Sequence, residues 1–171
     1  VPRFLDRLIS LYRNNDKIFK FLHMPVQRGS ERILRKMKRG HTAKIFLDVV
    51  KELRKKIPEI TIATDIITGF PSESESDFEE TLNLIEESQP DVINSSKYSP
   101  RPGTVASKYP RLNTKIGKER STRLHERIKK TSMSRNQMWY GWNGKILIDE
   151  LLENGKIQGR NYAYRPVIIN L

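Results

Sequence analysis

Cysteine is absent from this sequence of 171 residues. Without a thiol, the chain's own residues can form neither a disulfide bond nor a thiolate metal site. The three histidines, His23, His41 and His125, are too scattered along the chain for a convincing zinc site. No apolar run approaches the roughly 20 residues that a membrane-spanning helix needs. No signal peptide precedes the first amphipathic segment either, so we expect a cytoplasmic protein that starts like the middle of a longer one.

Charge is distributed unevenly, although the net charge of +12 is strongly basic. Residues 1–57 contain 16 Lys or Arg and five Asp or Glu, and residues 97–145 contain 13 and two. Residues 58–96 contain ten Asp or Glu and no Lys or Arg. A basic excess concentrated in segments is typical of a protein that binds a phosphate backbone. The alternative is the solvated surface of a generally Lys-rich protein, but the acidic block argues against so general a bias.

Residues 61–71 (TIATDIITGFP) have the pattern of a buried strand that is closed by a Gly-Phe-Pro turn. Apolar side chains alternate onto both faces, which is typical of a central strand in a parallel sheet covered by helices. Asp65 interrupts this run shortly before the turn, and ligands gather at the carboxyl ends of such strands. We therefore expect a small-molecule site around residues 65–71. The alternative, that Asp65 and Thr68 only satisfy loop amides, stays open on spacing alone.

The predicted elements alternate between helices and strands. Strands are expected over residues 18–24, 61–71 and 91–98. The helix before the last of them is predicted to begin at a capping box formed by residues 76–79 (SDFE), and Thr42 is expected to cap an earlier one. Short links between such elements imply right-handed parallel units. The fold class is therefore α/β, with only part of a barrel or open sheet present.

A long basic helix is predicted over residues 114–138, and its narrow apolar stripe leaves most of its surface to solvent or to an anionic partner. A composition shift follows at the Trp and Gly residues, so we divide the chain into domains 1–138 and 139–171. The second domain is expected to be a β-module with an Asn154-Gly155 hairpin turn. Its predicted strands cover residues 145–152, 156–164 and 167–171.

Four motifs occur in a specific order: residues 23–30 (HMPVQRGS), 37–42 (MKRGHT), 64–71 (TDIITGFP) and 98–104 (YSPRPGT). Together they resemble the radical S-adenosylmethionine (SAM) methylthiotransferase family. The resemblance covers the carboxyl-terminal half of its partial (β/α) TIM-like barrel and the start of its TRAM domain, a small β-barrel. Residues 159–166 (GRNYAYRP) are most similar to the archaeal and eukaryotic branch acting on threonylcarbamoyl-adenosine in tRNA.

This resemblance implies a transferase that methylthiolates N6-threonylcarbamoyl-adenosine next to the anticodon. Such enzymes reduce S-adenosylmethionine with a [4Fe-4S] cluster to a radical, which abstracts hydrogen from a base carbon before a methylthio group is installed. The family holds the cluster on a Cys-x3-Cys-x2-Cys loop, which this sequence lacks. Because iron–sulfur clusters need thiolates, we expect a fragment that is inactive alone, with the cluster present only in a longer protein.

The resemblance also implies which residues contact S-adenosylmethionine. The expected set is Gln27, Ser30, Arg39, Asp65, Gly69, Phe70, Pro71 and Arg101. Arg39 would bind the methionine carboxylate bidentately, or else be a surface charge at a helix end. Arg101 would contact the cofactor or the tRNA base, or else a phosphate or nothing beyond its turn. Arg28 departs from the family, which usually has serine there. His23 is as consistent with packing as with function, and no residue is predicted to be catalytic or a metal ligand.

The expected partner is tRNA. The residues predicted to contact it are Lys130, Arg135, Lys145, Arg160, Tyr162 and Arg165, because basic groups bind phosphates and aromatic faces stack bases. Alternatively, Tyr162 and Tyr164 lie on one strand and simply pack one face of the module. A second interpretation of the whole chain is an RNA-binding module without catalytic activity. The exposed sheet edges of a partial barrel would also allow self-association.

Overall fold

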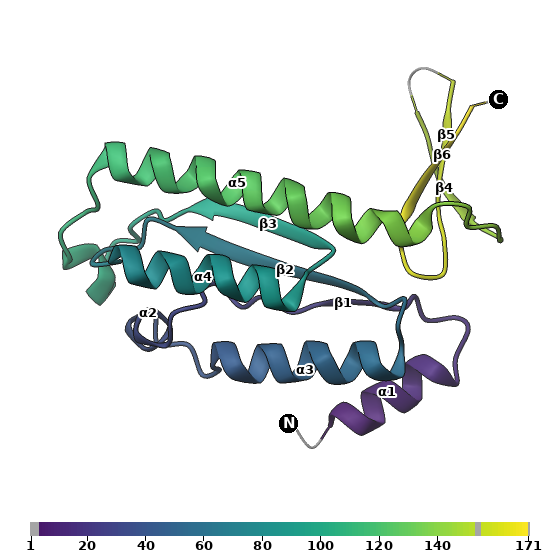
Figure 1. Ribbon diagram of the computed structural model, residues 1–171, viewed down its shortest axis with the longest axis horizontal. Helices are drawn as coiled ribbons and strands as arrows, with labels where there is room; N and C mark the ends of the chain where they lie inside the picture. Colours follow the sequence, from purple (N-terminus) through teal and green to yellow (C-terminus); the bar gives the residue numbers. More distant parts are fainter. Residues whose placement is uncertain (1–3, 153–154, 171) are drawn as a thin grey trace.

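The computed structural model of the chain describes residues 4–152 and 155–170. Within them the protein forms two sheets of three strands, one parallel and one antiparallel (Figure 1). The elements in chain order are α1 (Leu5–Arg13), β1 (Phe21–His23), α2 (Glu31–Lys36), α3 (Ala43–Lys56), β2 (Thr61–Thr68), α4 (Glu75–Ser88), β3 (Val92–Lys97), the 3-10 turn η1 (Val105–Lys108), α5 (Thr114–Asn136), the 3-10 turn η2 (Gln137–Trp139), β4 (Leu147–Leu151), β5 (Ile157–Arg160) and β6 (Pro166–Ile169).

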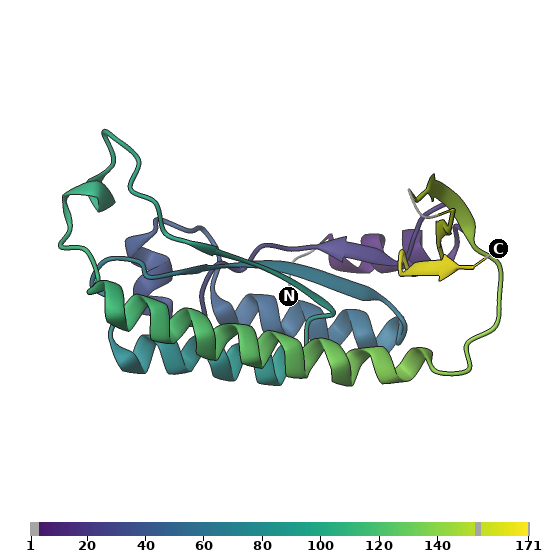
Figure 2. The same ribbon diagram turned by 90° about the horizontal axis from the view of Figure 1, so that it is seen from above.

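The parallel sheet has the strand order β1-β2-β3, so β2 is central and pairs on both sides. Figure 2 shows α3, α4 and α5 on one face of this sheet, while the opposite face of β2 and β3 carries no helix among the described residues. The prediction of an α/β fold with parallel strands is therefore confirmed. The first strand is shorter than the predicted 18–24, because only Phe21–His23 pairs with β2 as a strand.

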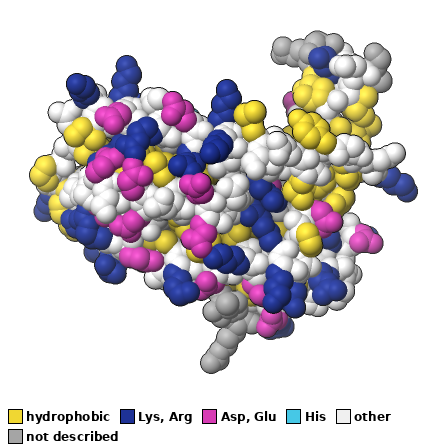
Figure 3. All heavy atoms as spheres, in the orientation of Figure 1, with side chains coloured by type: hydrophobic (Ala, Val, Ile, Leu, Met, Phe, Trp, Pro, Cys, Tyr) yellow, Lys and Arg dark blue, Asp and Glu magenta, His cyan; other side chains and the backbone are white. Residues whose placement is uncertain are grey.

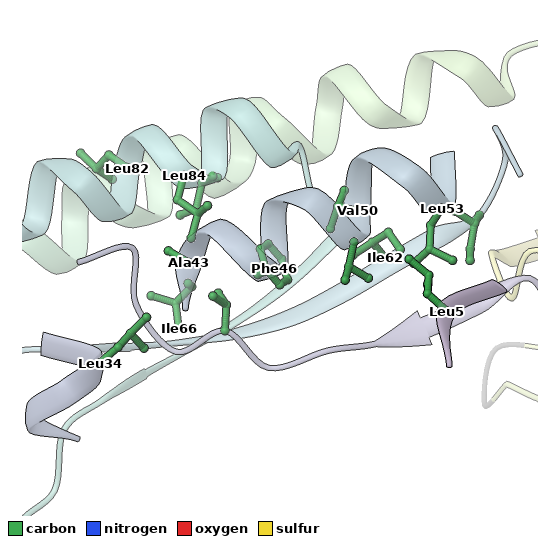
Figure 4. Packing of buried hydrophobic residues seen from close by; sticks show 14 of the residues in the cluster. Leu5, Leu34, Ala43, Phe46, Val50, Leu53, Ile62, Ile66, Leu82 and Leu84 are labelled. Carbon is green, nitrogen blue, oxygen red and sulfur yellow. The ribbon is translucent and has the colours of Figure 1, made fainter. Parts of the chain in front are cut away.

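The hydrophobic core lies between β2 and the helices. Ile60, Ile62 and Ile66 are fully buried and face this layer. Phe46 and Leu53 of α3 meet them from the other side, as the close view shows (Figure 4). At roughly 1.5–3 kcal/mol for each large apolar side chain buried, this layer holds β2 in place. The strand that ends at the predicted ligand site is thus anchored along its length.

The start of α4 differs from the expected capping box at residues 76–79. The box is formed by Ser74 and Asp77: the Ser74 hydroxyl accepts from the Asp77 amide at 3.2 Å, and the Asp77 carboxylate accepts from the Ser74 amide at 2.7 Å. The prediction was wrong by two residues because Asp77 can occupy the third helical position as well as glutamate can. Thr42 caps α3 as predicted, accepting from the Ile45 amide at 3.1 Å.

The basic helix α5 finds its anionic partner within the same chain. Arginines along α5 form ion pairs with the acidic block of the sequence, on α4 and its flanking loops, so that basic and acidic side chains are interspersed on this face (Figure 3). The pairs are Arg120 with Glu73 and Glu75, Arg123 with Glu75 and Glu79, Arg127 with Glu86, and Arg135 with Asp91. Most of the arginine charge on α5 is therefore used in packing this helix against α4.

The antiparallel sheet has the order β4-β5-β6 and contacts the start of β1 through the turn at residues 161–165. Lys20 donates its amide to the Tyr162 carbonyl at 2.7 Å, and the Tyr164 ring lies 5.0 Å from those of Phe19 and Phe21. Tyr162 and Tyr164 thus lie in a turn rather than on one strand, and they pack against different partners. Asn154 of the predicted hairpin turn lies outside the described residues.

Candidate cofactor and nucleic-acid site

A cavity of about 610 Å³ opens at the carboxyl ends of β2 and β3. This volume is within the range of typical small-molecule sites. The end of α2, the turn after β2, the end of β3 and the loop that leads into η1 each supply part of the wall. The lining residues are Lys36, Met37, Lys38, Arg39, Ile67, Phe70, Ser96, Lys97, Tyr98, Ser99, Arg101, Gly103, Thr104, Val105 and Ala106.

Three of the eight predicted cofactor residues, Arg39, Phe70 and Arg101, line this cavity. Phe70 is 2% exposed, and its ring lies edge-on to Tyr98 with 5.1 Å between ring centroids. Gly69 precedes it with φ of 73°, and a Cβ added there would meet no atom within 4 Å. The turn after β2 therefore leaves open space next to an aromatic wall, while Arg39 and Arg101 contribute exposed cations.

Gln27, Ser30 and Pro71 are not among the residues that line the cavity. Gln27 has φ of 71° and continues the β1 pairing: its amide donates to the Asp65 carbonyl at 2.8 Å, and its carbonyl accepts from the Ile67 amide at 3.1 Å. The buried Ser30 hydroxyl donates to Asp77 at 2.6 Å. The side chain of Ser30 is thus occupied by α4, and Pro71 is buried in the turn.

Asp65 occupies the face of β2 opposite the helices, in a polar row across the sheet. Its Oδ1 atom lies 2.9 Å from Nε2 of His23 on β1 and accepts from the Asn94 amide group on β3 at 3.0 Å. Asp65 therefore bonds with side chains of both neighbouring strands, not with loop amides. His23 is partly exposed, with 43% of its side chain accessible. The sequence alone does not predict a role for Asn94, because nothing in a single β3 residue marks its register with Asp65.

Arg28 is fully buried and forms an ion pair with Glu73, which Arg120 also contacts at 2.9 Å. Burial lowers the pKa of Arg28, although Glu73 opposes this effect. Burial likewise raises the pKa of Glu73, and the two arginines offset that shift in part. Arg28, where the family usually has serine, thus packs against the segment before α4. In this structure Arg28 is not available to an external ligand.

The predicted RNA contacts have different surroundings. Lys130 and Lys145 are exposed. Arg135 pairs with Asp91 at 2.9 Å, and Arg160 pairs with Asp149 at 2.6 Å while lying over the Tyr164 ring. Arg165 donates to Asn136, and burial lowers its pKa. Tyr162 packs edge-on to Trp139 at 6.0 Å. Arg135 and Arg160 are therefore ion-paired within the chain, and Arg165 bonds with a neutral amide. Lys130 and Lys145 are exposed and have no ion pair among the described residues.

The donor set of the cavity fits S-adenosylmethionine but not an iron–sulfur cluster. Exposed guanidinium groups suit a carboxylate, and the open space beside Phe70 suits an aromatic base. No thiol occurs in the sequence, and within residues 4–152 and 155–170 no group of three or more metal-ligating side chains is placed to hold a metal ion. No helix in the same ranges is long and apolar enough to cross a membrane.

The sequence profile of the Radical SAM superfamily matches residues 1–85. A solved radical SAM enzyme, coproporphyrinogen III oxidase (HemN) from Escherichia coli, has a similar fold, with a TM-score of 0.61. The likeness covers 74% of this chain and 30% of that protein at 20% identity, so it bears on the fold alone. The chain therefore belongs to the radical SAM superfamily, and its sheet and helices form part of the TIM-like fold of that superfamily.

Similar sequences narrow the family further. The probable threonylcarbamoyladenosine tRNA methylthiotransferase of Pyrococcus abyssi is 43% identical over 169 residues, which are 99% of this chain and 40% of the relative. The tRNA-2-methylthio-N(6)-dimethylallyladenosine synthase of Thermus thermophilus is 38% identical over 97% of this chain and 36% of that protein. The chain thus spans about two fifths of the length of these two relatives, and both are named for the methylthio modification of an adenosine in tRNA or for its methylthiotransferase.

Proposed function

We propose that this chain is the cofactor- and RNA-facing part of an enzyme that methylthiolates N6-threonylcarbamoyl-adenosine next to the anticodon of tRNA. The observation that carries the proposal is the cavity at the carboxyl ends of β2 and β3, in which Arg39, Phe70 and Arg101 of three family motifs meet. The similarity to the Pyrococcus abyssi protein supports this choice of base. Because its substrate is tRNA, we place the enzyme in the cytoplasm.

The residues of this chain would bind and orient S-adenosylmethionine, which supplies radical chemistry once it is reduced. Arg39 would pair with the methionine carboxylate, since its guanidinium is exposed at the cavity. Phe70, with the open space at Gly69, would bound the adenine. Gln27 has a positive φ angle next to β2, and such angles in residues other than glycine are concentrated at functional sites. We therefore keep Gln27 in the proposed cofactor site. Asp65 would position His23 and Asn94, the two side chains with which it forms hydrogen bonds.

A [4Fe-4S] cluster would need ligands from outside this sequence, because it holds no cysteine. We propose that the 171 residues bind the cofactor but complete no turnover without a segment that carries three cysteines. Domain 1–138 would then be the barrel part. Domain 139–171, with β4, β5 and β6, would be the start of a TRAM-like module that contacts tRNA through Lys145 and Tyr162.

The alternative is an RNA-binding module in which α5 supplies the affinity. Exposed lysines such as Lys130 support some contact with phosphates. However, the arginines Arg120, Arg123, Arg127 and Arg135 pair with acidic side chains of the same chain, so the cations that α5 leaves for RNA are its lysines. We therefore prefer the enzyme fragment.

Cofactor binding tests the proposal with S-adenosylhomocysteine as the probe, measured by isothermal titration calorimetry. We expect wild-type protein to bind it and Arg39→Gln to weaken binding about tenfold or more, because a charge-assisted hydrogen bond to the carboxylate is lost. Arg35→Gln, which removes an exposed charge of α2 that does not line the cavity, should bind like wild type. Tight RNA binding without any cofactor binding would favour the RNA-binding module instead.

A further inference from the structure

The cavity at the ends of β2 and β3 carries an unbalanced positive charge. Among the residues that the structure describes, its lining contains five Lys or Arg and no Asp or Glu. They come from three separate segments: the end of α2, the end of β3 and the loop after it. They are Lys36, Lys38, Arg39, Lys97 and Arg101. Like charges gathered in one concave site repel each other and raise the local concentration of anions.

These cations differ from the arginines of α5 because their charge is not neutralised within the described residues. Lys38, Arg39, Lys97 and Arg101 form no ion pair there. Lys36 has only neutral partners, the Ser72 hydroxyl at 2.8 Å and the Tyr109 ring. The acidic side chains that the structure describes lie elsewhere, and none of them lines this cavity. The arrangement is that of a site for an external anion.

The remaining wall indicates that the anion belongs to a small group rather than to a phosphate backbone. Ile67, Phe70 and Val105 provide apolar surface, and two serines, Ser96 and Ser99, also line the cavity. Tyr98 also lines the cavity, and its hydroxyl is buried without a hydrogen-bond partner among the described residues. A buried donor of this kind costs free energy unless a ligand satisfies it. The ligand should therefore combine an anionic group, hydrogen-bonding groups and some hydrocarbon.

On the basis of the proposed function, we propose that Lys97 and Arg101 bind the carboxylate of the threonylcarbamoyl group on the target adenine. Threonine joined through a carbamoyl link keeps its carboxylate, hydroxyl and methyl groups, which match the cations, the polar hydroxyls and the apolar wall. A dimethylallyl group offers only hydrocarbon and would leave the cations desolvated without a partner. The two cations would therefore favour the threonylcarbamoyl base over the dimethylallyl base, which are the bases named for the relatives at 43% and 38% identity.

The test measures the affinity of the 171-residue protein for three anticodon stem-loop RNAs of one sequence by fluorescence anisotropy. The target adenine is unmodified, threonylcarbamoylated or dimethylallylated. The three RNAs have equal numbers of phosphates, so their affinity ratio isolates the side group. We expect wild-type protein to prefer the threonylcarbamoyl RNA about tenfold over the other two, as for a hydrogen bond to a charged group.

The double variant Lys97→Gln/Arg101→Gln should reduce this ratio to about one. Its control is Lys55→Gln/Lys56→Gln, which removes the same charge from exposed residues at the carboxyl end of α3 and should keep the ratio. Unmodified RNA is the reference for each variant, because its affinity reports the phosphate contacts alone. Both variants should still bind S-adenosylhomocysteine, since this proposal assigns the cofactor carboxylate to Arg39 and moves Arg101 from the expected cofactor contacts to the base.

Each failure has a distinct meaning. Equal affinity of wild-type protein for all three RNAs, with S-adenosylhomocysteine still bound, overturns the carboxylate site and leaves the proposed enzyme class intact. A preference that survives in the cavity variant overturns the assignment of Lys97 and Arg101. A preference for dimethylallyl RNA overturns both this site and the proposed base. Loss of S-adenosylhomocysteine binding in the cavity variant alone would assign these cations to the cofactor carboxylate and overturn the proposal.

Discussion

At the scale of single residues, Asp77 joins three neighbouring segments, although none of the four sequence motifs contains it. Its carboxylate closes the capping box of α4, accepts from Ser30 at 2.6 Å and pairs with Arg32 of α2. Burial would raise the pKa of Asp77, but the hydrogen bonds from Arg32, Ser30 and Ser74 outweigh burial, so the pKa lies well below its ordinary value of 3.8. One ionised carboxylate thus fixes α2 against α4 next to the cavity.

Replacement of this carboxylate should therefore cost stability in a pH-dependent way. Because the folded-state pKa is depressed, the contribution of Asp77 is fully present above 3.8, declines below that value and is lost only as the pH falls through the lower folded-state pKa. We expect Asp77→Asn to lower the free energy of unfolding by about 2–3 kcal/mol at pH 7, through the lost cap and charged hydrogen bonds. Denaturant titrations at pH 7 and at pH 3 should show the difference from wild type shrinking at the lower pH.

A matched control is Glu87→Gln, since Glu87 pairs with Lys51 on the surface with 56% of its side chain exposed. This change should alter the free energy of unfolding by less than about 0.5 kcal/mol. A constant difference between wild type and Asp77→Asn over the whole pH range would contradict the depressed pKa.

At the scale of elements, the contact between the segment after β1 and α4 is unusually close. A Cβ atom added to Gly29 would lie 2.3 Å from the Glu80 carbonyl oxygen and 2.6 Å from the Thr81 Cα atom. The Gly29 amide also donates to the Thr81 hydroxyl at 3.1 Å. Both obstacles are backbone atoms within a helix, so they cannot yield as a flexible side chain would. The glycine of the first motif therefore serves helix packing.

Glycine at this position should be irreplaceable. We expect Gly29→Ala to lower the free energy of unfolding by about 3 kcal/mol or more, the upper range for overpacking a filled site. Gly40→Ala places a Cβ with no atom within 4 Å and should change stability by less than about 1 kcal/mol. Thermal unfolding followed by circular dichroism compares the two variants. Equal midpoints would show that α4 moves aside at low cost.

Structural features that depend on local sequence were predictable, whereas contacts between distant segments were not. The β-branched run of β2 and the Thr42 cap are local signals, so the strand and helix were predictable. Ser30 and Arg28 were not, because their partners Asp77 and Glu73 lie more than 40 residues away and only the fold brings them together. Lys97 and Lys38 carry no local signal at all. Their role depends on the cavity, which three separate segments form.

At the scale of the whole molecule, the two sheets meet where the 161–165 turn packs on the start of β1. Ala163 and Asn161 are buried there, and Asn161 accepts from the Ala163 and Arg165 amides at 2.9 and 3.0 Å. Within residues 4–152 and 155–170, β1 and β3 each pair with one neighbouring strand, β2. Self-association through these edges stays a prediction, which sedimentation at several protein concentrations would check.

The ring of Tyr164 is the aromatic link between the sheets. Tyr164→Ala should lower the free energy of unfolding by about 1–2 kcal/mol, because two aromatic contacts with Phe19 and Phe21 are lost. Hydrogen exchange should rise in β5 and β6 while β2 stays protected. Tyr140→Ala is the control, since that side chain is 85% exposed. Unchanged exchange in β5 and β6 would show that the backbone bond from Lys20 alone holds the module.

The ion pairs that join α5 to α4 and its flanking loops constrain how the sequence can evolve. The acidic partners lie in residues 58–96 and the basic partners in residues 97–145, so the two segments are complementary. A chimera that inherits only one of them from a relative with different charges would leave the buried Glu73 without Arg120, which is far costlier than losing an exposed pair. The two segments should therefore be exchanged together, and recombination between them should be tolerated poorly.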